Sequence, residues 1–271
     1  MRQQDILLSI NPYHLQLIRP LIKWKIMSIK EVFEDSGYPA SYKTFHKIIQ
    51  RLEKNGVIRS FKDVWTKTRR IYLTFEGNSL VAPYGHVGHV YNEQNIFHDS
   101  RVTLYMRFLN LLYPISSINL EHEDLEFKKK DSFQRVRPDA RFEMEFNGKR
   151  SSFILEVELT QKSKERAIEK LANYKDDKSL RYVIFVFPTP SLYKSYLNLL
   201  KANAETLGKN NYIFVMDEGL VKGIPSMDAP AFYQNQDTTL HNVMKQIIGR
   251  IEGESDSSLD RLWRKHAELF F

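Results

Sequence analysis

The sequence contains no cysteine and no long run of apolar residues. Without cysteine the chain can form neither a disulfide nor a metal site with thiolate ligands. Its longest apolar stretches, such as Tyr182–Phe187, are far shorter than the roughly 20 residues that a membrane-spanning helix needs. The N-terminal residues 1–13 also lack the apolar segment of a signal peptide. We therefore expect a cytoplasmic protein that makes no contact with a membrane.

Acidic residues are scarce only in the N-terminal part of the 271-residue chain. Residues 1–77 contain 14 basic and 7 acidic side chains, whereas residues 78–271 contain 26 of each, so the whole net charge of +7 lies in the first segment. The composition, 42% hydrophobic and 27% charged, is that of a globular protein with one large or two smaller domains. The charge asymmetry indicates a polyanion-binding module joined to a neutral domain, and nucleic acid is the polyanion expected in the cytoplasm.

The basic segment has the pattern of three short helices followed by a β-hairpin. Helical spacing and capping residues predict helices over residues 11–25, 29–37 and 42–56. Alternating residues predict strands over residues 57–61 and 69–75. This order resembles the winged helix-turn-helix, in which the third helix enters the major groove and the hairpin, or wing, lies along phosphates.

By that resemblance, nine residues would contact DNA. Those at the start of the third helix are Ser41, Tyr42, Lys43, Thr44, His46 and Lys47. Those of the basic wing are Lys67, Arg69 and Arg70. The alternatives are a winged helix that contacts protein and a basic face that is merely solvated.

Residues 78–95 gather glycine, proline and asparagine without a clear period, and we place a linker there. This divides the chain into a first domain of residues 1–77 and a second domain of residues 96–271. The second domain is predicted to be α/β with the order αβββαβαβ. A C-terminal helical tail is predicted near residues 242–251 and 258–269.

The strongest local signal is Asn147-Gly148 between two alternating segments, a pair typical of a type I′ hairpin turn. If these two residues form the loop, the pairing register places Asp139 directly across from Glu156. One face of the hairpin is then apolar, and the other carries Asp139, Glu156 and Glu158.

Carboxylates that lie directly opposite each other repel unless a positive charge lies between them. Mg²⁺ or Mn²⁺ would supply that charge, because such cations take oxygen ligands. We therefore interpret Asp139, Glu156 and Glu158 as candidate metal ligands. The alternative is an ordinary solvated face whose acids are neutralised by Arg137 and Arg141.

The αβββαβ order, with Pro138-Asp139 opening the second strand and Glu156 on the third, resembles the PD-(D/E)xK nuclease superfamily over about residues 96–187. The lysine expected two residues after Glu156 is Glu158, which cannot donate a hydrogen bond when it is ionised. The role of that lysine would pass to a residue further along the chain. The candidates are Lys162, Lys164 and Lys170.

A narrower resemblance covers most of the chain. The winged helix, His98-Asp99 at a helix start, the RPDA and LEVELT segments and a KLxxY motif ending at Tyr174 are together similar to the replication-relaxation proteins and the MobC/TraX-type relaxases of mobilisable and conjugative plasmids. The resemblance implies a mixed-sheet nuclease domain behind a DNA-binding module. It also implies a magnesium- or manganese-dependent endonuclease that nicks DNA at the origin of a plasmid or integrative element.

In that interpretation the catalytic residues are Asp139, Glu156, Glu158, Lys162, His98 and Asp99. The expected partners are double-stranded DNA at an origin, single-stranded DNA and an accessory mobilisation protein. The alternative is a non-catalytic winged-helix regulator of replication or transfer whose nuclease-like domain is degenerate.

Overall fold

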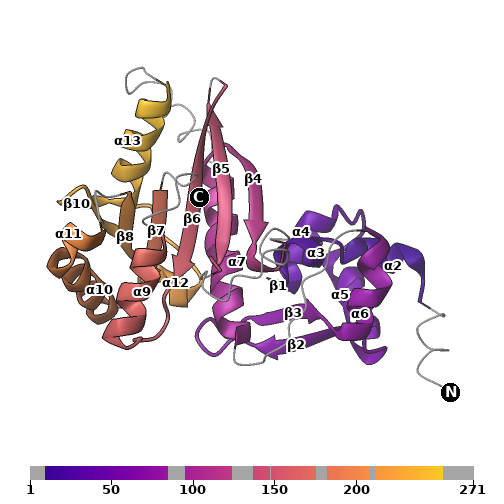
Figure 1. Ribbon diagram of the computed structural model, residues 1–271. Helices are drawn as coiled ribbons and strands as arrows, with labels where there is room; N and C mark the ends of the chain where they lie inside the picture. The colour runs from indigo at the N-terminus through magenta and orange to yellow at the C-terminus, as the bar shows by residue number, and fades with distance from the viewer. Residues whose placement is uncertain are drawn as a thin grey trace. The chain divides into compact units, whose positions relative to one another are not determined.

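The computed structural model describes residues 10–84, 95–123, 137–146, 148–174, 182–207 and 211–252 (Figure 1). The chain forms two compact units. The first comprises Met1–Thr103 and His122–Leu125, and the second comprises Leu104–Glu121 and Glu126–Phe271. Among the helices in these ranges, none has both the length and the apolarity to cross a bilayer.

The first unit contains short helices and a three-stranded antiparallel sheet of order β1-β3-β2. Its elements in chain order are α2 (Pro12–Leu17), α3 (Pro20–Trp24), β1 (Ile26–Ser28), α4 (Ile29–Ser36), α5 (Tyr42–Lys54), β2 (Ile58–Lys62), β3 (Arg69–Leu73), α6 (Phe75–Val81) and the 3₁₀ turn η1 (Ala82–Tyr84). Apolar residues from all the helices named and from all three strands form one buried core.

Local chemistry explains most helix boundaries in this unit. Ser28 caps α4 through a capping box with Glu31, and Ser41 caps α5 by accepting a hydrogen bond from the Thr44 N–H. The predicted helix over residues 11–25 is two helices, α2 and α3. Pro20 explains the break, because it has no N–H to continue the first helix and its fixed φ suits the first position of the second.

The linker predicted for residues 78–95 is wrong over residues 78–84. These residues form the second half of α6 and the turn η1, while residues 85–94 lie outside the described part of the chain. The Thr74 side chain caps α6, and Val81 is fully buried in the core of the unit. Helix capping and tertiary packing therefore override the turn-like composition of this segment.

The second unit is built on a seven-stranded mixed sheet of order β10-β9-β8-β7-β6-β5-β4. Helix α7 (Ile96–Leu112) contributes its residues from Leu104 onward. The remaining elements are β4 (Ile115–Leu120), β5 (Ala140–Phe146), β6 (Lys149–Val157), α9 (Lys164–Asn173), β7 (Tyr182–Phe187), α10 (Pro190–Ala202), α11 (Ala204–Leu207), β8 (Tyr212–Met216), α12 (Gly219–Lys222), β9 (Pro230–Tyr233), β10 (Gln236–Thr239) and α13 (Leu240–Glu252). The 3₁₀ turn η3 (Glu121–Glu123) begins in this unit, and its last two residues belong to the first unit.

The predicted order αβββαβαβ is present in α7, β4, β5, β6, α9, β7, α10 and β8. Strands β4, β5 and β6 are antiparallel, and β6, β7 and β8 are parallel. The hairpin β9–β10 was not predicted, because the segment around Pro225 and Pro230 reads as irregular from the sequence. The second predicted tail helix, over residues 258–269, lies outside the described residues.

The predicted hairpin register is confirmed. Phe146 pairs with Lys149, and the ladder runs regularly to Ala140 opposite Leu155. Gly148 has a φ of +75°, as the predicted turn requires at this position, while Asn147 lies outside the described residues.

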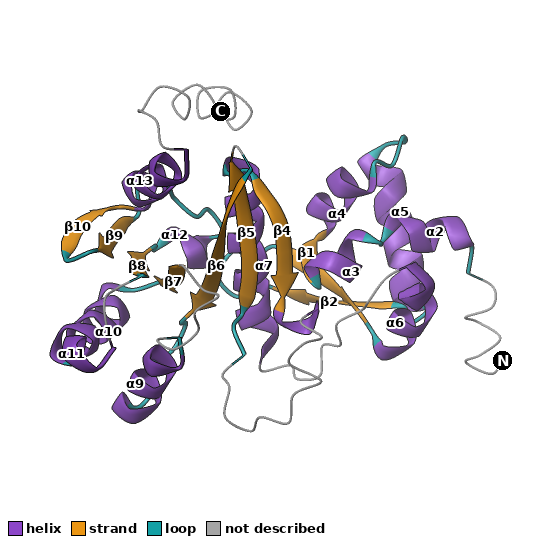
Figure 2. Ribbon diagram, turned by 45° about the horizontal axis from the view of Figure 1, so that its top comes forward, coloured by secondary structure: helices purple, strands orange, loops and turns teal. Residues whose placement is uncertain are grey.

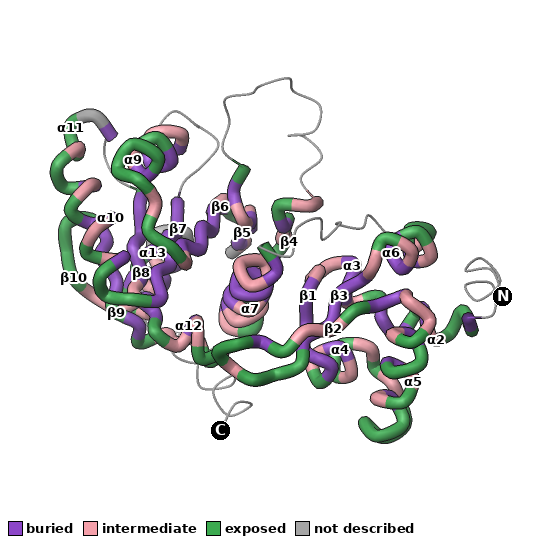
Figure 3. The backbone as a smooth tube through the Cα atoms, turned by 90° about the horizontal axis from the view of Figure 1, so that it is seen from below, coloured by how far each residue is buried: buried purple, intermediate pink, exposed green. Residues whose placement is uncertain are grey.

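Helices cover both faces of the central strands. Figure 3 shows β7 and β8 buried, with α9 and the second-unit part of α7 on opposite sides of the sheet. Helices α9 and α10 share a buried cluster with Ile154 and Phe185, and α13 contacts the sheet along β5, β6, β9 and β10 (Figure 2). The predicted acidic face of β6 therefore lies beneath α9, and its carboxylates are inside the protein.

Candidate active site

Asp139 and Glu156 lie next to each other where the β5–β6 hairpin begins. Asp139 immediately precedes β5, and its backbone carbonyl accepts a hydrogen bond of 3.1 Å from the Glu121 N–H. Its Oδ2 atom accepts a bond of 2.7 Å from the N–H of Val157, the residue after Glu156. The Val157 contact attaches Asp139 to β6 beyond the last paired residues of the ladder, and the Glu121 contact attaches it to the residue after β4. Glu156 is fully buried within β6.

Helix α9 brings two polar side chains to Glu156. Ser163 caps this helix, and Lys170 and Tyr174 are four residues apart, so both project from one face. The Tyr174 hydroxyl donates a hydrogen bond to Glu156 Oε1, and Lys170 Nζ lies 2.5 Å from Glu156 Oε2. The KLxxY spacing therefore places an ammonium and a phenol on the two oxygens of one carboxylate.

Glu158 binds two lysines. It is 1% exposed, and its Oε1 accepts hydrogen bonds of 2.6 Å from Lys170 Nζ and 2.9 Å from Lys162 Nζ. Its Oε2 lies 2.8 Å from the same Lys162 ammonium. Lys170 is almost fully buried and bridges Glu156 and Glu158, whereas the Lys162 side chain is 36% exposed.

Burial dominates the electrostatics of this cluster. It raises the pKa of Glu156 to about 8, and the neighbouring charge of Asp139 acts in the same direction. Burial alone would lower the pKa of Lys170, but Glu156 and the other nearby acids outweigh it and raise that pKa. Burial and the adjacent Glu156 also raise the pKa of Tyr174. Lys170 is thus charged and Tyr174 is neutral across the physiological range.

The cluster fits a metal only in part. Mg²⁺ is usually held by one or two carboxylates with water and phosphate oxygens, and Asp139 with Glu156 would be such a pair once the ion displaced the Lys170 ammonium from Glu156 Oε2. Glu158 does not fit as a third ligand, because both of its oxygens are held by lysine ammonium groups. Within the described residues, no three or more His, Cys, Asp or Glu side chains are grouped so that they could hold a metal ion. The three-carboxylate site expected from the sequence is therefore not present as such in the described residues.

Asp99 has a partner within the first unit. Its Oδ2 lies 2.5 Å from Lys25 Nζ, and its Oδ1 lies 3.6 Å from His98 Nδ1. Burial opposes ionisation of Asp99, but the hydrogen bond from His98 and the charge of Lys25 lower its pKa. The geometry thus gives Asp99 an ion-pairing role in the first unit, and its catalytic role, like that of His98, stays a prediction.

The start of helix α5 presents polar side chains to solvent. The five exposed or partly exposed predicted residues after the cap are Tyr42, Lys43, Thr44, His46 and Lys47. The Ser41 hydroxyl is engaged in capping, because it accepts from the Thr44 N–H and lies 3.1 Å from the Thr44 hydroxyl. The ring of Tyr42 packs edge-on against Phe33, which sets its direction. This helix end therefore combines a fixed scaffold with exposed cations.

The three basic residues predicted for the wing differ in their exposure and in their partners. Lys67 is exposed, and its ammonium donates a hydrogen bond to the Val64 carbonyl. Arg69 is exposed and pairs with Glu53. Arg70 is 4% exposed, so the prediction that it contacts phosphate is wrong.

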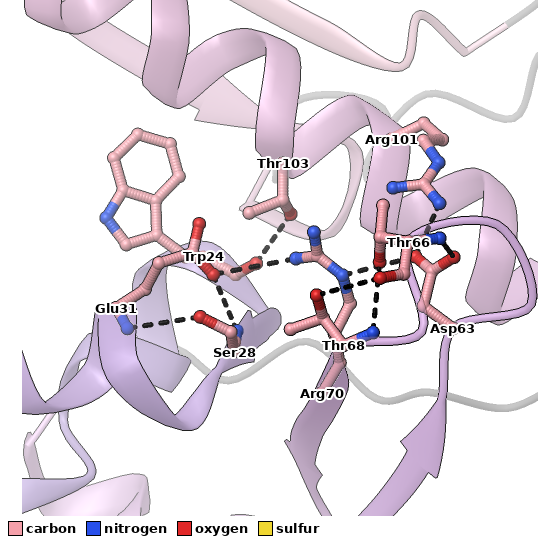
Figure 4. A network of polar contacts seen from close by, with 9 residues as sticks. All are labelled: Trp24, Ser28, Glu31, Asp63, Thr66, Thr68, Arg70, Arg101 and Thr103. Carbon is pink, nitrogen blue, oxygen red and sulfur yellow. Dashed lines mark hydrogen bonds and ion pairs between the residues drawn. The ribbon is translucent and has the colours of Figure 1, made fainter. Parts of the chain in front are cut away.

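The reason for the burial of Arg70 is a network of ion pairs inside the first unit. Its guanidinium lies between Asp63 and Glu31, as Figure 4 shows. A second buried arginine, Arg101 of α7, donates a hydrogen bond to the same Asp63 carboxylate. Asp63 and Arg101 were not singled out in the sequence, where neither belongs to a motif.

No protein-family model matches the chain, and no curated protein matches it. Among solved structures, the chain is similar to the restriction endonuclease FokI, with a TM-score of 0.30 and 12% identity over 77% of this chain and 43% of the FokI chain. The structure of FokI bound to DNA gives a TM-score of 0.25 with the same identity and coverage. The chain thus spans less than half the length of FokI. A likeness of this size assigns neither a residue role nor an activity to this chain.

Proposed function

We propose that this protein is a metal-dependent DNA nuclease that nicks one strand at the origin of a plasmid or integrative element. The observation that carries the proposal is the pairing of Asp139 with Glu156 beside the ammonium of Lys170, at the base of a hairpin in a mixed sheet. In this proposal these groups correspond to the acid pair and the cation of a PD-(D/E)xK centre, with the lysine supplied from α9. In this proposal the first unit is a winged helix that binds the DNA.

Each side chain of the centre has a distinct task in this mechanism. Asp139 and Glu156 would hold a Mg²⁺ or Mn²⁺ ion, which, when bound, supplies an activated water and neutralises charge on the scissile phosphate. Tyr174 donates a hydrogen bond to Glu156 and so fixes the direction of its carboxylate. Lys170 remains charged and supplies the positive group that stabilises negative charge developing on the phosphate.

Lys162 and Glu158 act together in a supporting role. Glu158 cannot donate to an anionic phosphate, and it is instead the acceptor that holds the two lysines in place. Lys162 is the more exposed of the two lysines, and in this proposal its ammonium contacts a neighbouring phosphate of the same DNA strand. Glu158 in this position is therefore consistent with catalysis if the lysine function has moved to the helix.

DNA docking is assigned to the exposed residues at the start of α5. Lys43 and Lys47 provide charge, and the polar side chains around them provide hydrogen bonds to phosphates or base edges. Lys67 at the hairpin adds a further cation. Because phosphate contacts release counterions, affinity for duplex DNA should fall steeply as the salt concentration rises.

The test is the conversion of a supercoiled origin plasmid to its nicked form in Mg²⁺ or Mn²⁺. Asp139→Asn and Glu156→Gln should each abolish nicking, because an amide of the same size cannot become the anionic ligand that the metal requires. The matched control is Glu145→Gln, which changes a partly exposed carboxylate of the same sheet that is paired with Arg150. Nicking that survives either of the first two substitutions would remove those residues from the mechanism.

A second candidate function is a non-catalytic winged-helix regulator whose nuclease-like domain has lost activity. The specific observation in its favour is that Lys170 lies against both Glu156 and Glu158, so the protein already supplies a cation where a metal would bind. Calorimetric titration with Mn²⁺ separates the two functions. The regulator predicts no heat that depends on Asp139 or Glu156, whereas the nuclease predicts uptake that both substitutions abolish.

A further inference from the structure

The loop between β2 and β3 is held in one shape by a single buried carboxylate. Asp63 is fully buried, and its Oδ1 accepts hydrogen bonds of 2.9 Å from the Trp65 N–H and 3.1 Å from the Thr66 N–H. Its backbone N–H donates to the Thr68 carbonyl, and its own carbonyl accepts from the Lys67 N–H, both at 2.9 Å. The loop therefore closes on itself through four bonds to one residue.

The other carboxylate oxygen of Asp63 anchors the loop to the body of the unit. It accepts from Arg70 Nε at 3.3 Å and from Arg101 Nη2 (Figure 4). Both arginines are buried, so the loop is held by charge-assisted bonds away from solvent. Removing one partner of such a buried ion pair strongly destabilises the folded protein, because the other charge is left uncompensated. The loop is accordingly a rigid element.

Trp65 stands on this rigid loop with its ring only partly covered. The Arg101 guanidinium lies over the ring, 5.0 Å from its centroid, and Phe97 packs against it at 5.9 Å and an interplanar angle of 69°. The residue nevertheless remains 45% exposed, beside Val64, which is 52% exposed. An aromatic ring that is held in place by such packing and is still partly exposed loses little conformational entropy when a ligand stacks on it.

The positive charge of the β2–β3 hairpin favours the binding of a polyanion. Between Ile58 and Leu73 the sequence has five basic residues and one acidic residue, Asp63, whose charge is buried and paired. Arg59, Lys62 and Lys67 are exposed in the same hairpin. A partly exposed aromatic ring on a hairpin that also carries exposed cations is an arrangement with which proteins bind unpaired nucleotides, because a base can stack on the ring while the cations contact phosphates.

We propose that Trp65 is a stacking platform for an unpaired base of single-stranded DNA, held in position by the Asp63–Arg101 pair. A base inside a duplex has no open face to stack on the ring, so the platform distinguishes single strands from duplex. The inference deepens the proposed function, on which it depends for the class of ligand. It assigns to the hairpin a contact with bases in addition to the phosphate contacts expected of a basic wing.

The direct test uses the fluorescence of Trp65 in the full-length chain. Of the three tryptophans, Trp24 and Trp263 are replaced by phenylalanine, which leaves Trp65 as the only tryptophan. The protein is titrated in EDTA with a short oligothymidylate and separately with a blunt duplex of equal length. Stacking predicts saturable quenching by the single strand and much weaker quenching by the duplex. Absence of quenching at saturating oligothymidylate overturns the proposal.

Substitutions at Trp65 separate stacking from packing. Trp65→Ala and Trp65→Leu should each lose roughly tenfold in affinity for the single strand, because neither has a π-face, while Trp65→Phe should stay within about threefold of the wild type. Trp65→Leu keeps apolar volume over Arg101, so it remains informative if the alanine variant is unstable. Phe75→Ala, at an aromatic residue of α6 that is 69% exposed, is the control and should leave affinity unchanged. An equal loss for single strand and duplex, or no loss with leucine, refutes stacking.

The result does not depend on the nuclease activity. Because the titration contains no metal, it measures binding separately from nicking, and Glu145→Gln, which lies outside both proposed sites, should bind oligothymidylate like the wild type. A protein that stacks bases but never nicks DNA would leave this inference standing and overturn the proposed function. A protein that nicks DNA but binds single strands equally well without Trp65 would overturn this inference and leave the proposed function standing.

Discussion

Glu156→Gln tests whether Glu156 carries a proton in the folded protein at neutral pH. Burial and the nearby Asp139 raise the pKa of Glu156 to about 8, against an ordinary value of 4.5. Between these two pH values the folded protein holds a proton that the unfolded chain has released. The stabilisation is complete below pH 4.5 and is lost as the pH rises through about 8, so the free energy of unfolding falls across this window.

The size of the fall follows from the two pKa values. One proton corresponds to about 1.4 kcal/mol per pH unit, so the whole window corresponds to about 5 kcal/mol. Glutamine resembles the protonated acid in shape and in its ability to donate a hydrogen bond, and it does not titrate. We therefore expect Glu156→Gln to match the wild type near pH 5 and to become progressively more stable than the wild type towards pH 8.5.

The assay is urea unfolding in EDTA at several pH values, analysed as the difference between the two proteins. The difference is needed because other groups titrate in the same range. Burial lowers the pKa of His122 to about 4, which makes stability rise with pH between about 4 and 6.5 in both proteins. Glu145→Gln is the surface control and should show no trend. A flat difference between the wild type and Glu156→Gln would refute the reasoning.

Two further predictions concern packing and buried charge. Lys170→Met should lower the free energy of unfolding, measured in urea, by about 3–5 kcal/mol, because it leaves buried carboxylates without their ammonium partner. The double variant Lys170→Met/Glu158→Gln should recover part of that loss, because one of those carboxylates is then neutral. Gly77→Ala should cost about 1–3 kcal/mol, since an added Cβ would lie 1.9 Å from the Val57 carbonyl oxygen. Ser79→Ala, at an exposed position two residues away, should change the melting temperature little; equal shifts for the two alanine variants would contradict this explanation.

Some of the fold follows from short-range sequence signals and some does not. Asn147-Gly148 predicted the register of the β5–β6 hairpin because that turn requires positive φ, a conformation that this pair adopts readily. The β9–β10 turn also places two residues, Gln234 and Asn235, at positive φ, but it has no glycine to reveal it. Strand β1 is only three residues long, and it exists through its pairing with β3. Such elements depend on tertiary contacts that local pattern does not contain.

One part of the candidate site likewise follows from the sequence, and another part does not. The adjacency of Asp139 and Glu156 followed from the register alone. The choice among Lys162, Lys164 and Lys170 did not, because it depends on how α9 is rotated against the sheet, and Lys170 is the one that this rotation buries. Arg69 and Arg70 are consecutive in a strand and must face opposite sides, but only the buried Asp63 decides which of the two points inward.

The acid cluster of the centre leads to a final prediction about metal. The charge of Asp139 helps to raise the pKa of Glu156, so a bound cation beside the two carboxyl groups would favour the ionised form of Glu156. If the nuclease proposal is right, Mn²⁺ at a hundred times its dissociation constant should stabilise the folded protein by about 2.7 kcal/mol in urea unfolding. Asp139→Asn should abolish that stabilisation and Glu145→Gln should preserve it. Equal stability of the wild type with and without Mn²⁺ would favour the non-catalytic regulator, in which the protein's own cations, Lys170 among them, hold the acids without a metal.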